Sequence, residues 1–140
     1  MNKMVCVIGA GYWGKNHIKT LFKLNSLGGI VDTDEKTLNK LLNSYSGVRG
    51  HLNSEEALTY DYDGYIIATP ASTHFKIAKL VINANKNVLI EKPMALSIKE
   101  AEELVFLVDN KKVNALVGHV LLFHPAVIKI KKMIKNGDIG

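Results

Sequence analysis

Residues 5–14 read VCVIGAGYWG and decide the fold. An apolar run of strand length leads directly into the pattern Gly-x-Gly-x-x-Gly, and a helical pattern follows over residues 13–24. Eighteen residues after Gly14, a second apolar run ends in Asp32. Strand, glycine turn, helix, strand and acid in this order are the fingerprint of a dinucleotide-binding unit. The alternative is a coincidental glycine-rich turn.

Each residue of the turn has an expected task. Gly9 permits the tight turn, Gly11 lets the backbone approach a pyrophosphate, and Gly14 lets the helix pack close to the strand. The free N–H groups at the helix start then face the phosphates, and the helix dipole adds roughly half a positive charge. Tyr12 and Trp13 lie within the turn and are predicted to contact the cofactor as well.

Asp32 is predicted to select the cofactor. A carboxylate at the end of the second strand accepts hydrogen bonds from both ribose hydroxyls of adenosine and repels a 2′-phosphate. No arginine follows to bind such a phosphate, so NAD is favoured over NADP. The alternative is that Asp32 caps the next helix, a role that Asp34 fits better.

Strand and helix patterns alternate along the whole chain, which predicts an α/β fold with one dinucleotide-binding domain over residues 1–140. Continuous apolar strands indicate a doubly wound parallel sheet covered on both faces, in the order 3-2-1-4-5-6. Helix starts are predicted at Thr33 or Asp34, at Ser72 or Thr73, and at Ser97. Expected strands are 3–8, 28–31, 47–51 (weak), 64–68, 87–90 and 114–118; expected helices are 13–24, 34–44, 72–84, 97–110 and 124–136, with a short turn at 54–58.

Composition excludes several classes of function. The net charge is +5, but 17 of the 18 basic residues are lysines and only Arg49 is an arginine, which argues against nucleic-acid binding and for a small anionic ligand. No apolar run is long enough for a membrane span, and the early strand pattern leaves no room for a signal peptide. Cys6 lies inside the first strand and is expected to be an unreactive core residue. A cytoplasmic location fits these features, and no metal site is expected.

Ligands of such sheets bind at the carboxyl ends of the strands. Thr69 and Pro70 follow one strand, and His74 falls in the next helix turn, where it is either a ligand contact or an ordinary polar residue. Glu91 and Lys92 follow the next strand. A lysine held there can share a proton with a substrate hydroxyl or carbonyl, although lysines at loop starts are usually only solvated.

Residues 9–17 (GAGYWGKNH), the Ala68-Thr69-Pro70 turn with His74, and the Glu91-Lys92-Pro93 triplet occur in this order. Together they resemble the glucose-fructose oxidoreductase / inositol dehydrogenase / MocA family of nicotinamide-dependent oxidoreductases. The resemblance implies that Lys92 hydrogen-bonds the reacting oxygen of a sugar or polyol while hydride passes to or from the nicotinamide. The residue pattern GYWGKN, with Gly-His after the sixth strand, is similar to members that act on UDP-linked N-acetyl sugar uronates.

Two departures from the family qualify this expectation. Members carry a second α/β domain that supplies a catalytic histidine and most substrate contacts, whereas this sequence stops at Gly140; many also have an arginine where this chain has Leu122. His119 is a candidate catalytic residue at a strand end, and His124 is expected only to start a helix. The resemblance implies a chain that binds NAD but is inactive alone, and that self-associates or needs a partner. The alternative is a stand-alone NAD-binding module; Glu91-Lys92-Pro93 disfavours a methyltransferase.

Overall fold

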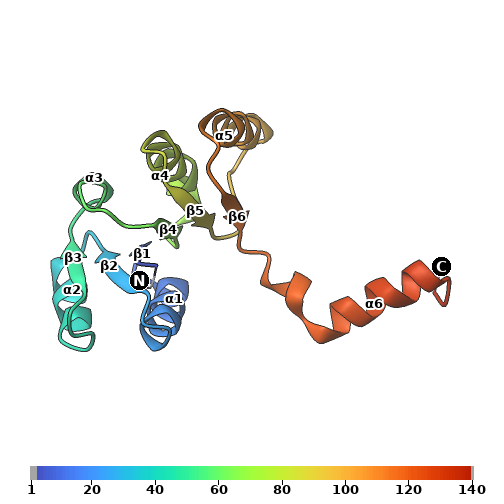
Figure 1. Ribbon diagram of the computed structural model, residues 1–140, viewed down its shortest axis with the longest axis horizontal. Helices are drawn as coiled ribbons and strands as arrows, with labels where there is room; N and C mark the ends of the chain where they lie inside the picture. Colours follow the sequence, from blue (N-terminus) through green and yellow to red (C-terminus); the bar gives the residue numbers. More distant parts are fainter. Residues whose placement is uncertain (1–2, 140) are drawn as a thin grey trace.

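The computed structural model describes residues 3–139 and forms one parallel sheet with helices on both faces (Figure 1). Along the chain the elements are β1 (Val5–Ile8), α1 (Tyr12–Lys23), β2 (Leu27–Val31), α2 (Glu35–Leu42), β3 (Arg49–His51), α3 (Ser54–Ala57), β4 (Gly64–Ile67), α4 (Ala71–Asn83), β5 (Asn87–Ile90), α5 (Ile98–Lys111), β6 (Ala115–Val117), the 3₁₀ helix η1 (Val120–Phe123) and α6 (Pro125–Asn136). The six strands lie in the order β3-β2-β1-β4-β5-β6, which confirms the predicted topology.

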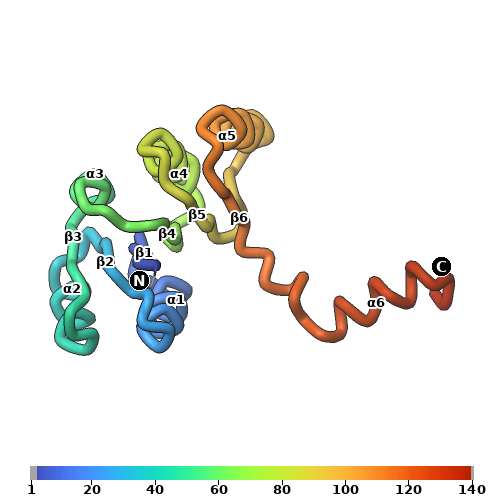
Figure 2. Tube along the Cα trace, viewed as in Figure 1, coloured from blue at the N-terminus to red at the C-terminus, as the bar shows by residue number. Residues whose placement is uncertain are grey.

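β1 lies at the centre of the sheet because the chain starts there and then builds outward in both directions. Val7 pairs with Ile30 of β2 on one side and with Ile66 of β4 on the other. Figure 2 shows the chain passing from β3 through α3 to β4, which returns it to the free side of β1. After β1 the chain continues into a helix on one face of the sheet, and after β4 into a helix on the other face. The crevice between these two helix starts is the usual ligand position of this fold.

Two apolar clusters hold the layers together. α1 and α2 cover one face, where Val7, Ile18 and Ile30 are fully buried; α4 and α5 cover the other, where Ile67 and Val81 are fully buried (Figure 1). Burying each such side chain contributes about 1.5–3 kcal/mol. These clusters hold the helices against the sheet, and thereby hold in place the loops at its carboxyl edge, where the functional residues lie.

Two expectations from composition can be compared with the structure. Cys6 is fully buried, and its burial raises the pKa of the thiol, so the prediction of an unreactive core residue is confirmed. Within residues 3–139, every helix is too short or too polar to cross a bilayer.

Two of the predicted helix caps are confirmed and one is wrong. The Asp34 carboxylate accepts from the Lys36 N–H at the start of α2, and the Ser97 hydroxyl accepts from the Glu100 N–H at the start of α5. α4, however, begins at Ala71, directly behind Pro70, so neither Ser72 nor Thr73 is its cap. The fixed φ of proline sets the entry to this helix in place of a capping side chain.

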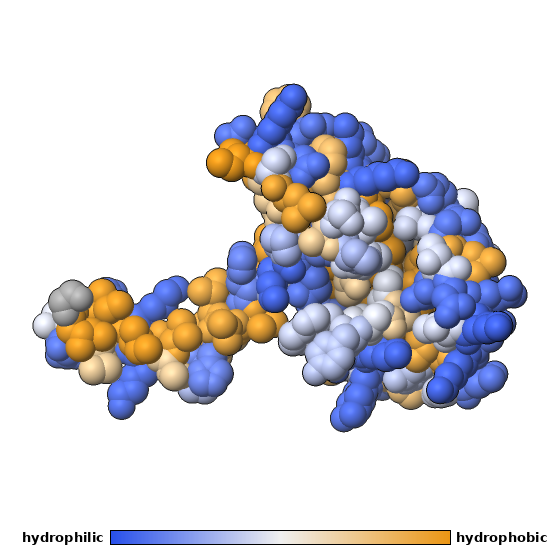
Figure 3. Space-filling view, turned by 180° about the vertical axis from the view of Figure 1, so that it is seen from behind, coloured by the Kyte–Doolittle hydropathy of each residue, from blue (hydrophilic) through white to orange (hydrophobic). Residues whose placement is uncertain are grey.

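The C-terminal arm, residues 120–136, leads away from the sheet (Figures 1 and 2). Its first part, η1, was not predicted, whereas α6 was; His124 starts α6 as expected, with its Nδ1 accepting from the Ala126 N–H. Apolar side chains lie along the exposed arm (Figure 3). They are Val120, Leu121, Leu122, Phe123, Ile128, Ile130 and Ile134.

Candidate cofactor-binding site

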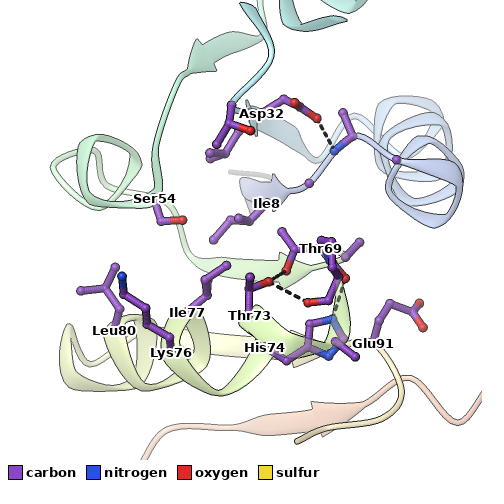
Figure 4. A pocket seen from close by; sticks show the side chains of 18 of the residues that line it. Ile8, Asp32, Ser54, Thr69, Thr73, His74, Lys76, Ile77, Leu80 and Glu91 are labelled. Atoms are coloured by element: carbon purple, nitrogen blue, oxygen red, sulfur yellow. Dashed lines mark hydrogen bonds between the residues drawn. The ribbon is translucent and has the colours of Figure 1, made fainter. Parts of the chain in front are cut away.

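A cleft of about 830 Å³ opens at the carboxyl edge of the sheet. Figure 4 shows Asp32 on one side of this opening, Thr69 on the other and Ile8 between them. Ten of the predicted site residues line the cleft: Gly9, Gly11, Tyr12, Trp13, Asp32, Thr69, Pro70, His74, Glu91 and Lys92. The start of α3 and the inner side of α4 also line the cleft and were not predicted to do so; they add Asn53, Ser54, Lys76 and Ile77. No motif marks these positions, because only the sheet order brings them to this edge.

The glycine turn combines one strained position, one close contact and one open position. Gly9 has a φ of +96°, and a Cβ there would lie 2.8 Å from the Ala68 carbonyl oxygen. A Cβ on Gly14 would overlap the Gly9 carbonyl oxygen, so α1 can lie against β1 only without a side chain. A Cβ on Gly11 would meet nothing within 4 Å. The space over Gly11 is therefore free for a ligand.

The start of α1 faces the cleft without a side-chain cap. Its N-cap is Gly11, which has no side chain, and its first turn carries no acidic residue. The first N–H groups of a helix have no partner within the helix, and the dipole is positive at this end. This helix start therefore suits the phosphates of a dinucleotide.

Asp32 is held firmly between two backbone segments. Its Oδ2 accepts from the Ala10 N–H and its Oδ1 from the Asp34 N–H, both at 2.9 Å. Asp34 is the helix cap, because its carboxylate accepts from the Lys36 N–H and the Thr37 hydroxyl. These hydrogen bonds lower the pKa of the Asp34 carboxyl. Each oxygen of Asp32 retains a lone pair for a ribose hydroxyl on the cleft side.

Thr69 and His74 are tied into the turn after β4. The Thr73 hydroxyl donates to the Thr69 hydroxyl at 2.8 Å (Figure 4). His74 is only 1% exposed; its Nδ1 lies 2.7 Å from the Pro93 carbonyl oxygen and its Nε2 lies 2.8 Å from the Thr69 carbonyl oxygen. His74 thus joins two loops of the cleft through backbone contacts, and its direct contact with cofactor remains a prediction.

Glu91 is a buried carboxylate with a partner that the sequence analysis did not assign. Its Oε1 lies 2.7 Å from His17 Nε2, and its Oε2 accepts from the Lys92 N–H at 3.3 Å. A Cβ on Gly118 would lie 3.0 Å from Oε2, so the absence of a side chain there makes room for the carboxylate. His17 lies three residues after Gly14, on the same face of α1, and this spacing is the signal that could have revealed it.

The two predicted catalytic residues differ in position. Lys92 lines the cleft, is exposed, and its ammonium group has no hydrogen-bond or ion-pair partner within residues 3–139. His119 is exposed at the start of η1 and is not among the residues that line the cleft. A catalytic role for either one remains a prediction.

The site lacks the side chains for a resident metal ion. Within residues 3–139, no three or more His, Cys, Asp or Glu residues lie close enough together to hold one. The arrangement of glycine turn, uncapped helix start and acid is instead that of a Rossmann dinucleotide-binding domain. The sequence profile described as "Oxidoreductase family, NAD-binding Rossmann fold" matches residues 3–119. The chain therefore belongs to the glucose-fructose oxidoreductase / inositol dehydrogenase / MocA family and is its NAD-binding domain.

Individual relatives agree with this assignment. The UDP-N-acetylglucosamine 3-dehydrogenase of Acidithiobacillus ferrooxidans is 31% identical over 126 residues, covering 86% of this chain and 38% of that protein. GenD2 from gentamicin A biosynthesis, solved with NAD, has a TM-score of 0.88 at 31% identity, covering 95% of this chain and 39% of its own. WlbA from Bordetella pertussis, solved with NADH and UDP-GlcNAcA, has a TM-score of 0.91 at 26% identity, covering 98% of this chain and 44% of its own. The chain thus spans about two fifths of these relatives.

Replacing Gly11 by valine should abolish NADH binding while leaving the fold intact. The side chain would enter open space over the turn, where it meets no protein atom but would occupy the place of the pyrophosphate. NADH fluorescence enhancement measures binding, and the far-ultraviolet circular dichroism spectrum measures folding. Normal binding by the folded variant would show that the pyrophosphate lies elsewhere.

Gly14→Ala is the matched comparison from the same turn. Its methyl group would overlap the Gly9 carbonyl oxygen, so this variant should lose about 2 kcal/mol or more of unfolding free energy despite the better helix propensity of alanine. Urea unfolding measures that loss.

Proposed function

We propose that this chain is the cofactor-binding part of an NAD-dependent dehydrogenase that acts on a sugar or nucleotide sugar. The observation that carries the proposal is the position of Lys92. Lys92 follows the carboxyl end of β5 and lines the same cleft as the glycine turn and Asp32, and its ammonium group has no partner within residues 3–139. This group is therefore free to hydrogen-bond a substrate oxygen.

Different residues along the cleft have different proposed roles. The start of α1 binds the pyrophosphate and Asp32 binds the adenosine ribose, which directs the nicotinamide toward Thr69 and Lys92. When bound, NAD supplies the acceptor or donor of a hydride. In substrate oxidation, the neutral amine of Lys92 takes the proton from the hydroxyl group as the carbonyl forms. In reduction, the ammonium group returns that proton to the oxygen. We keep His119 as the candidate for a second proton-handling group.

A nucleotide sugar is the substrate class that we favour. The relative from Acidithiobacillus ferrooxidans is named as a dehydrogenase of UDP-N-acetylglucosamine. WlbA of Bordetella pertussis was solved in complex with UDP-GlcNAcA. The net charge of +5 also favours an anionic ligand over a neutral one. Because the composition suits a reducing compartment, we propose the cytoplasm as the location.

Asp32→Ala tests the cofactor preference. The unmodified chain should bind NAD(H) more tightly than NADP(H), because Asp32 accepts from the ribose hydroxyls and repels a 2′-phosphate. The variant should lose much of that difference. Calorimetric titration with both cofactors measures it; equal or tighter NADP(H) binding by the unmodified chain would contradict the assignment. Asp34→Ala is the control, because that carboxylate caps α2.

Lys92→Ala tests the proposed chemistry. In a protein that contains this chain and turns over, kcat should fall by at least about 10²-fold, the low end for a positioned acid–base group. NADH affinity should change little, because the lysine serves the substrate oxygen. Turnover is measured on a panel of sugars and UDP-sugars, with Lys99→Ala, an exposed lysine on α5, as the control. Near-normal turnover of the Lys92→Ala variant would contradict the proposed acid–base role of Lys92.

We also propose that the 140-residue chain self-associates through its C-terminal arm. Leu121 is 69% exposed and Phe123 is 74% exposed, among other apolar side chains on the arm. Contiguous apolar surface of this kind favours association in water. Light scattering should give more than the monomer mass of 15.5 kDa, and Leu121→Ser with Phe123→Ser should lower it. A monomer mass for the unmodified chain would refute this.

A further inference from the structure

We propose that His17 and His74 are positioning residues that fix the lysine loop, residues 91–93, against the two helices that hold the cofactor. One histidine contacts the residue before Lys92 and the other contacts the residue after it. The structural part of this inference stands by itself, while its consequence for turnover rests on the proposed function.

The first contact is the pair of His17 and Glu91. The Glu91 side chain is 8% exposed and the His17 side chain 21%, and their nearest atoms are 2.7 Å apart. A carboxylate so buried is costly without a hydrogen-bond partner. Its other oxygen accepts from the Lys92 N–H and lies above Gly118. His17 therefore holds in place a group that itself holds the Lys92 backbone.

The second contact is made by His74 on the far side of the loop. Its ring is almost fully buried, and each ring nitrogen lies within 2.8 Å of a carbonyl oxygen, from Thr69 and from Pro93. A ring nitrogen that carries a proton donates to the carbonyl oxygen that faces it, and the ring lies between the two backbone segments. His74 thus links the turn after β4 to the end of the lysine loop.

The two histidines come from two helices, α1 and α4, that begin at the cleft. His17 belongs to α1, whose start faces the expected phosphates, and His74 belongs to the first turn of α4. The Lys92 side chain has no partner within residues 3–139, so only its backbone is held, by the contacts of the neighbouring residues. These contacts connect both helices to the residues on either side of Lys92.

Hydrogen exchange of the Lys92 amide tests the first contact in the 140-residue chain without cofactor. His17→Leu removes the partner of Glu91 and should speed exchange of this amide by about tenfold or more, because a lost local hydrogen bond lowers the opening free energy. His17→Gln retains a side-chain donor and should restore part of the protection. The amide of Val7 in β1 reports whether the fold is intact, and His124→Leu, on the arm, is the matched histidine control.

Unchanged exchange in folded His17→Leu would overturn the proposed role of His17. If that variant does not fold, Glu91→Gln takes its place: it weakens the pair without changing its size and should speed Lys92 exchange less than tenfold. No change in that variant would likewise overturn it.

Hydrogen exchange of the amides after Pro93 tests the second contact. His74→Phe removes both contacts and should speed this exchange, because the loop loses its attachment to α4. His74→Gln should retain one of the two contacts and speed the exchange less. Equal exchange in the two variants and the unmodified chain would overturn the role of His74.

Comparing kcat with NADH affinity shows whether His17 positions Lys92 or only stabilises the fold. In a protein that contains this chain and turns over, His17→Leu should lower kcat by about tenfold or more, since small displacements of a catalytic group are costly. NADH affinity, followed by quenching of Trp13, the single tryptophan, should change by less than about threefold. Equal losses of affinity and kcat would overturn the positioning role. Failure of the unmodified chain to bind NADH would refute the proposed function and leave the exchange result standing.

Discussion

The contact between Gly14 and the Gly9 carbonyl oxygen is the constraint on which the site depends. It lets α1 start directly over the end of β1, and no side chain fits between them. The Ala10 N–H is thereby brought to the Asp32 carboxylate, which links the turn to the end of β2. A shift of α1 by the width of a methyl group would break that bond, move the helix start away from the cleft and carry His17 away from Glu91. The packing of α1, the geometry of the cofactor site and the placement of the lysine loop thus all depend on the close contact between Gly14 and Gly9.

Features set by local sequence could be predicted, and contacts between distant segments could not. Apolar runs predicted every strand, and the alternation of strands with helices indicated the order of a doubly wound sheet. The choice of Asp34 over Asp32 as the cap of α2 also followed from local geometry. The pairing of His17 with Glu91 depends on residues 74 positions apart, which come together only when α1 packs on β1 and β2 and β5 joins the same sheet. η1 was missed because its four apolar residues carry no periodic pattern, and the cap of α4 was misassigned because Pro70 sets that helix start by its ring.

The cleft combines rigid walls with lysine side chains that are not held by a partner. Asp32 and His74 are each bonded at two points, and Glu91 is bonded through both its oxygens, so the surfaces that would face a dinucleotide are fixed before it arrives. Preorganised polar groups reduce the entropy lost on binding. Among the described residues, the side chains of Lys92 and Lys76 line the cleft without a hydrogen-bond or ion-pair partner, and Lys92 is the one that follows β5. Its fixed backbone and free side chain are what a proton-sharing group needs, because the side chain can follow the substrate oxygen while its attachment stays in place.

The separation of the C-terminal arm from the sheet has a consequence for cooperativity. α6 has 12 residues, a length at which an isolated helix is marginal in water. Its main contacts are with η1, so its helicity depends largely on local features: the His124 cap, Lys135 in the last turn and the left-handed Gly137 at its end. The sheet and the arm are therefore separate cooperative units. Whatever surface covers the arm lowers the free energy of its helical state, so docking and helix formation there are one coupled equilibrium.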